Sequence, residues 1–69
     1  MERTPIQSSN IISVGYEKDK LVLEIEFKNG IYQYSGVSED IYLGLINASS
    51  AGRYFHAHIK DKYSCHQVA

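Results

Sequence analysis

Residues 11–35 spell IISVGYEKDKLVLEIEFKNGIYQYS, in which apolar and polar side chains alternate on either side of two turn signals. Ile12, Val14 and Tyr16 share one side of the first segment, and the same alternation returns in residues 21–27. A period of two is typical of half-buried β-strands, because successive side chains point to opposite faces. The stretch therefore predicts three antiparallel strands with one common apolar face.

The two turns set the pairing of these strands. Asn29-Gly30 favours a two-residue type I′ turn, in which both residues have φ > 0. That turn would place Phe27 opposite Tyr32 and bring both Tyr32 and Tyr34 onto the apolar face. The first turn, within residues 17–20, leaves two registers open, which differ by two residues and keep the same faces together.

The residues after the strands predict two helices. Ser38 is a good N-cap with acidic residues directly after it, and the helix that follows should cover residues 39–48. Gly44 in the middle of this helix indicates close packing against the sheet. Apolar residues then recur at helical spacing in residues 51–60, which predicts a short second helix.

The predicted fold is α+β: an antiparallel three-stranded β-meander packed by one α-helix and followed by a short second helix. Residues 63–68 alternate enough for a C-terminal fourth strand, and a small curled barrel is the alternative architecture. Residues 1–9 are polar and contain the only proline, so they predict a flexible lead-in to a single domain formed by residues 10–69.

The composition fits a globular domain without a strong overall charge. The chain has 69 residues, of which 43% are hydrophobic and 22% are charged, and its formal net charge is -1. Such a charge does not draw a whole protein to nucleic acid or to acidic membranes. After residue 50, however, Arg53, Lys60 and Lys62 accompany a single acid, Asp61. We therefore expect any anionic partner to bind the C-terminal third.

Cysteine content and hydropathy indicate the compartment. The single cysteine, Cys65, excludes an internal disulfide and is typical of a reducing environment. The first ten residues have no apolar segment of the kind found in signal peptides, and no apolar run is long enough to span a membrane. We therefore expect a cytoplasmic protein with no membrane partner.

The candidate catalytic and metal-binding residues do not form a recognisable set. His56 and His58 are two positions apart, so on a helix they would point in different directions and would not bind one metal ion. The adjacent side chains of Cys65-His66 diverge in the same way on a strand. The acids of Glu24-x-Glu26 share a face with lysines and predict a solvated sheet surface. We expect no enzyme activity, metal, cofactor or small-molecule ligand.

The best candidate for a binding site is a basic strip near the C-terminus. If the second helix continues to Lys60, then Arg53, His56 and Lys60 share one face, with Tyr54 at its flank and Lys62 beyond. Cations at this spacing suit contacts with successive phosphates. The same pattern also describes the solvated face of an amphipathic helix.

Tyr32 and Tyr34 carry a second binding hypothesis. On an open sheet face, two such rings could stack on the bases of single-stranded RNA. The expected register places them beside Ile25 and Phe27 instead, which predicts core tyrosines with hydroxyl groups at the rim. The two interpretations compete for the same pair of residues.

Four segments, taken in order, are similar to one known family. They are Ser8-Ser9-Asn10-Ile11, Val14-Gly15-Tyr16, Tyr32-Gln33-Tyr34 and Ala48-Ser49-Ser50-Ala51-Gly52-Arg53-Tyr54-Phe55. Together they resemble the KTSC domain, which is named after the C-terminus of some lysyl-tRNA synthetases. The family occurs mostly as short bacterial and phage proteins with a central Tyr-x-Tyr motif. The resemblance covers residues 8–63 and carries over no catalytic residue. The family has no assigned function, and its synthetase context suggests binding to RNA or tRNA.

The predicted helix over residues 39–48 supports an alternative function. Tyr42, Leu43 and Ile46 add apolar side chains outside its core-facing stripe and leave little polar surface. Some other surface should therefore cover this helix. The short second helix could do so. If it leaves the apolar helix partly bare, a second copy of the chain or another protein would cover the rest, which makes a protein-interaction or self-associating domain the alternative.

Overall fold

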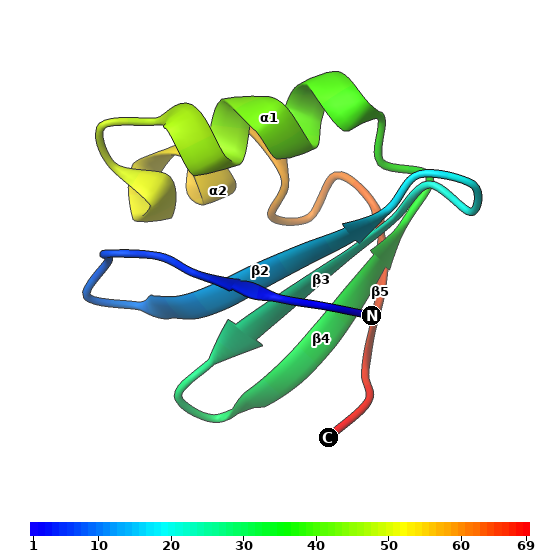
Figure 1. Ribbon diagram of the computed structural model, residues 1–69, viewed down its shortest axis with the longest axis horizontal. Helices are drawn as coiled ribbons and strands as arrows, with labels where there is room; N and C mark the ends of the chain where they lie inside the picture. Colours follow the sequence, from blue (N-terminus) through cyan, green and yellow to red (C-terminus); the bar gives the residue numbers. More distant parts are fainter.

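The computed structural model describes all residues, 1–69, and consists of a five-stranded sheet and two helices. In chain order these are β1 (Thr4–Pro5), β2 (Ile11–Glu17), β3 (Val22–Phe27), β4 (Gly30–Ser35), α1 (Glu39–Asn47), α2 (Ala51–His58) and β5 (Ser64–Gln67). All neighbouring strands are antiparallel, and the sheet is open, with β1 and β5 at its edges. Both helices lie over one face of the sheet (Figure 1). The predicted α+β fold, with its meander and C-terminal strand, is confirmed.

The first hairpin, β2 with β3, pairs Val14 with Ile25, which is one of the two registers that the sequence leaves open. A bulge between Ile11 and Ser13 interrupts this pairing near the start of β2. The extra residue turns Ile11 inward and leaves Ile12 42% exposed. The expectation that Ile12 lies on the apolar face is therefore wrong.

The second hairpin, β3 with β4, pairs Leu23 with Tyr34. The pairing expected from a turn at Asn29-Gly30 is wrong by two residues, because Lys28 and Asn29 form the turn. Gly30 instead begins β4 with φ 148°, a conformation that residues with a side chain rarely adopt. A shift of two residues preserves the alternation, so both tyrosines of β4 still lie on the face toward the helices.

Serine caps set the start of both helices. Ser38 and Ser50 accept hydrogen bonds from backbone N–H groups in the first turns of α1 and α2. Gly44 of α1 lies against Tyr54 of α2, where an added Cβ atom would clash with the ring. The glycine therefore allows close contact between the helices, rather than with the sheet as expected. Neither helix is long and apolar enough to cross a membrane.

The core lies between the helices and the sheet. Its largest fully buried side chains are Ile11, Val14, Leu23, Ile25, Val37, Leu45 and Ile59. Tyr16 packs against this core, and its hydroxyl group donates a hydrogen bond to the carbonyl oxygen of Val37 at 2.6 Å. Its ring also stacks on Tyr42, with the ring centroids 5.0 Å apart. Burial, together with the charge of Glu39, raises the pKa of Tyr16.

The N-terminal residues cover part of the polar face of the sheet. Within residues 1–9, strand β1 pairs with β2 as an edge strand. This pairing brings Arg3 over Gly15, whose missing side chain leaves room for the N-terminal backbone. It also brings Arg3 into an ion pair with Glu24, which is only 6% exposed.

Glu24 lies at the centre of a hydrogen-bonded network on this face. Gln33 Nε2 donates to its carboxylate at 2.9 Å, and Arg3 bridges from the same carboxylate to Ser13 Oγ, which lies 3.0 Å from Arg3 Nε. Ser13 in turn donates to Glu26 at 2.8 Å. Desolvation by burial opposes ionisation of Glu24, but the hydrogen bonds from Gln33 and Arg3 and the charge of Arg3 hold its pKa below the usual value. The solvated surface expected at Glu24 is therefore wrong.

Replacing Arg3 tests the contribution of this buried ion pair. Arg3→Ala should destabilise the fold by about 1.5–3 kcal/mol near neutral pH, because Glu24 loses a charged hydrogen-bond donor while remaining buried. The pair stabilises the fold at pH values above 4.5, the ordinary pKa of the carboxyl group, and this stability is lost as the pH falls through the lowered pKa. Urea unfolding at several pH values should therefore show the two proteins converging in acid.

Lys18→Ala is the matched control. It removes an ion pair with Glu39 in which both side chains are exposed, so the loss should be at most about 1 kcal/mol and should depend little on pH. Equal losses for Arg3→Ala and Lys18→Ala would show that the buried network adds no special stability.

A second substitution tests the position of the N-terminal strand. In Gly15→Ala the new Cβ atom would lie 2.5 Å from the backbone oxygen of Glu2 and 3.1 Å from Cγ of Arg3. The strand would have to move away, and thermal unfolding should show a loss of about 1–3 kcal/mol. In the control, Gly52→Ala, the nearest atom is 3.7 Å away, so this variant should be neutral or slightly stabilised. A loss of stability in Gly52→Ala alone would contradict the assignment.

Candidate functional site

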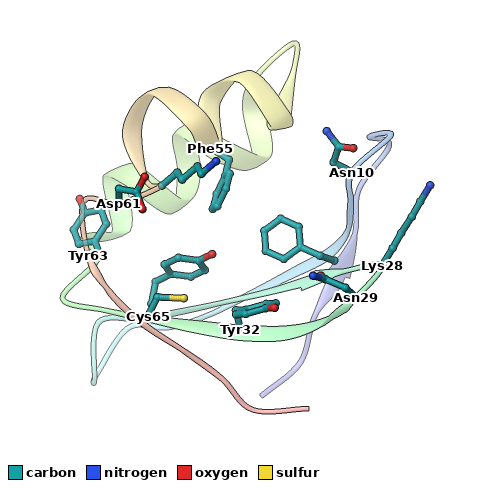
Figure 2. Close-up of a pocket in the computed structure, with 11 residues that line it drawn as sticks. Asn10, Lys28, Asn29, Tyr32, Phe55, Asp61, Tyr63 and Cys65 are labelled. Carbon is teal, nitrogen blue, oxygen red and sulfur yellow. The ribbon is translucent and has the colours of Figure 1, made fainter.

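An elongated cavity lies between the helix layer and the part of the sheet formed by β3, β4 and β5 (Figure 2). We call it the aromatic groove, and its volume is about 520 Å³. Five aromatic side chains line it, namely Phe27, Tyr32, Tyr34, Phe55 and Tyr63. In Figure 2, Phe55 points from α2 toward Tyr32 on the sheet.

Edge-to-face contacts hold the rings of the groove in place. Phe55 lies with its centroid 5.3 Å from that of Phe27 and 5.8 Å from that of Tyr34, and Phe27 lies 5.7 Å from Tyr32. The ring planes of these pairs cross at 65° to 77°, as the quadrupoles of aromatic rings favour. Tyr34 and Phe55 are buried, whereas Phe27, Tyr32 and Tyr63 are half-buried. The groove therefore has a packed base and an accessible aromatic wall.

The two tyrosines of the Tyr-x-Tyr motif have different surroundings. Tyr34 is 6% exposed, as the core interpretation predicts, but Tyr32 remains half-buried and lines the groove. Cys65 lies opposite Tyr34 in the pairing of β4 with β5. Burial raises the pKa of Tyr34, and the neighbouring Cys65 thiol adds to this effect. Its hydroxyl group therefore stays protonated at neutral pH.

Polar side chains surround the aromatic rings. Asn10 lies at one end of the groove, with Asp61 and Tyr63 at the other (Figure 2). Lys28, Asn29 and Lys60 also line it, and Lys28 extends away from the rings. Asn10 and Asn29 form internal hydrogen bonds only through backbone atoms, so both side-chain amides are free to bind another molecule.

A second cavity, of about 590 Å³, is mainly polar, and we call it the polar pocket. Residues 7–10 form one side, and residues 49–53 with His56 form the other. Ser8 orders the first segment, because its hydroxyl group accepts from the backbone N–H groups of Asn10 at 3.3 Å and Ile11 at 3.4 Å. Asn10 lines both cavities, so the polar pocket adjoins the aromatic groove.

The structure divides the basic strip expected from the sequence. Helix α2 ends at His58, so Lys60 is not on the helical face that carries Arg53 and His56. Arg53 and His56 line the polar pocket, whereas Lys60 lines the aromatic groove. Lys62 is exposed and lines neither cavity.

Tyr54 does not flank this strip in the expected way. It is half-buried, and its ring lies against Gly44 of α1 and 4.5 Å, centroid to centroid, from the ring of His58. The pattern of residues on one helix could not show this contact, because it depends on how α1 and α2 cross. Tyr54 thus belongs to the contact between the two helices.

Ion pairing separates the cations of the chain into two groups. The three ion pairs are Arg3 with Glu24, Lys18 with Glu39 and Lys20 with Glu17. The remaining lysines and arginines form no ion pair and are Lys28, Arg53, Lys60 and Lys62. Three of these four line a cavity, so the unpaired positive charge is gathered around the aromatic groove and the polar pocket.

Sequence reasoning missed the groove itself. Phe27 and Tyr63 lie 36 positions apart in the chain, and no local pattern joins them to Asn10 or Cys65. The available signal was the family resemblance, because three of its four segments supply residues that line the groove, namely Asn10, Tyr32 with Tyr34, and Phe55. No group of three or more histidine, cysteine, aspartate or glutamate side chains lies close enough together to hold a metal ion.

Known proteins are similar to this chain over nearly all its length. The model of the KTSC domain family matches residues 7–63. An uncharacterised protein of Stutzerimonas stutzeri (strain A1501) is 36% identical over 64 residues, which cover 91% of this chain and 90% of that protein. The crystal structure of a KTSC domain protein from Yersinia pestis is similar with a TM-score of 0.96 and 42% identity. That match covers 99% of this chain and 97% of the other.

Proposed function

Because the chain belongs to the KTSC domain family, we propose that it is a non-enzymatic binding module whose partner is RNA or a tRNA-like element. The observation that carries this proposal is the gathering of unpaired cations around the two cavities. We place the function in the cytoplasm, where a free and exposed thiol such as that of Cys65 stays reduced.

The charge distribution supports an anionic partner that binds locally. The net charge is only -1, so attraction to RNA cannot come from the molecule as a whole. Arg53 and Lys60 are exposed and form no internal ion pair, so a phosphate group would not have to compete with a carboxylate for them. Contacts of this kind supply affinity that is independent of sequence and sensitive to salt.

The salt dependence of RNA binding tests this proposal. The double variant Arg53→Ala with Lys60→Ala should bind a single-stranded RNA decamer more weakly than the natural protein. Its plot of log affinity against log salt should also be shallower by about 1.4, because each phosphate contact to a single strand contributes about 0.7. Fluorescence anisotropy of labelled RNA at several salt concentrations measures both quantities.

The matched control is Lys18→Ala with Lys20→Ala. It removes the same total charge, but from a hairpin whose cations are paired with acids, so the affinity should stay within about twofold of the natural protein. Equal weakening by both double variants would show that only total charge matters. Absence of binding by the natural protein at low salt would overturn the proposal.

Self-association through α1 is a second candidate function. Leu43 and Ile46 are 41% and 37% exposed and lie three residues apart, on one side of the helix. An apolar pair of this kind is a suitable centre for a contact between two copies of the chain. The remainder of the helix already packs in the core, since Leu45 is fully buried.

Light scattering with sedimentation tests this second candidate. The natural protein should form a dimer at high concentration, and Leu43→Glu should shift the equilibrium toward the monomer by at least about tenfold, because a buried unpaired carboxylate is costly. Ile12→Glu is the control, since Ile12 is equally exposed at 42% but lies on β2. A strict monomer at every concentration would remove this candidate.

A further inference from the structure

We propose that the aromatic groove binds one unpaired nucleobase of a single-stranded RNA, with Lys60 contacting the adjoining phosphate. This inference rests on the proposed binding of RNA and names the part of the protein that would hold a base. It assigns a direct binding role to Tyr32, whose side chain is accessible from the groove.

The groove has the size and the surface of a site for a flat ring. Its volume of about 520 Å³ falls within the range of small-ligand pockets. The half-buried rings of Phe27, Tyr32 and Tyr63 offer aromatic surface, and the buried rings of Tyr34 and Phe55 support them. Stacking on such side chains is how unpaired bases bind to proteins that recognise single strands.

The charges around the groove distinguish between ligands. Lys60 lines it beside a single acid, Asp61, and Lys28 lies at its edge with a side chain that extends away from the rings, so the net charge of the lining residues is positive. A quaternary ammonium group also binds to aromatic cages, but here it would meet the like charge of Lys60. A nucleotide carries a phosphate beside its base, and that phosphate complements the lysines. Charge complementarity therefore favours a base with its phosphate over a cation.

The free amides add a means of binding the base edge. Asn10 and Asn29 each present a hydrogen-bond donor and an acceptor, the groups that pair with the edges of bases. Asn10 also lines the polar pocket together with Arg53 and His56. A strand with one base in the groove could therefore continue toward these two residues.

Substitution of Tyr32 tests the inference. Tyr32→Leu removes the ring and should weaken binding of single-stranded RNA decamers by about tenfold, because stacking on one aromatic side chain contributes about 1–3 kcal/mol. The salt dependence should not change, because no phosphate contact is lost. Tyr32→Phe keeps the ring and should bind like the natural protein. Tyr42→Leu, which removes a half-buried ring from α1, should also bind normally.

Chemical blocking of the groove gives a second test that needs no substitution in it. Cys65 is the only cysteine, is exposed and lines the groove, so a bulky maleimide should react there and prevent base binding in the folded protein. The same treatment of Cys65→Ser should leave RNA affinity unchanged. Each protein's amide NMR spectrum shows whether the fold is intact.

The outcomes separate this inference from the proposed function. If RNA binds and neither Tyr32→Leu nor the maleimide weakens it, the base site is wrong while RNA binding stands. If RNA does not bind, the proposed function fails, and nucleoside monophosphates then test the groove alone. Shifts of groove amides with these nucleotides but not with ribose 5-phosphate would support a base site. Equal shifts with ribose 5-phosphate, or shifts with tetramethylammonium alone, would overturn it.

Discussion

The alternation of side chains across β2, β3 and β4 is the constraint on which the rest of the structure depends. In antiparallel strands, a change of register by two residues leaves every side chain on its own face, whereas a change by one exchanges the faces. The second hairpin differs from its expected register by two, and Tyr34 is still buried under the helices. Both layers of the protein, and the groove between them, follow from this parity.

The polar face of the same sheet is also organised. Glu24 is nearly inaccessible, yet the sequence around it alternates as an ordinary solvated strand would. The edge strand β1 accounts for the difference, because it carries Arg3 to the Glu24 carboxylate across the space left by Gly15. A short N-terminal segment therefore supplies the cation that pairs with the buried carboxylate of Glu24. The burial of this acid removes negative charge from the accessible surface.

The opposite end of the chain completes the proposed binding surface. Strand β5 pairs with β4 and brings Cys65 beside Tyr34, while the connection after α2 places Lys60 and Asp61 at the groove. The ion pairs engage Arg3, Lys18 and Lys20, and three of the four unpaired cations line one of the two cavities. A chain with almost no net charge can in this way present a locally positive surface to phosphates.

The sequence by itself determined the α+β class, the alternating faces of β3 and β4 and the serine cap of α1, and it favoured a core position for Tyr34, because these depend on local periodicity and on capping chemistry. It did not determine the turn at Lys28-Asn29, the end of α2 at His58 or the contact of Gly44 with Tyr54, since these depend on how separate elements meet. Only the tertiary structure joined Asn10, Tyr32 and Lys60 in one groove. The local sequence pattern indicates which face of a strand or helix a residue occupies. A cavity is formed by residues that lie far apart in the chain, so the pattern does not reveal it.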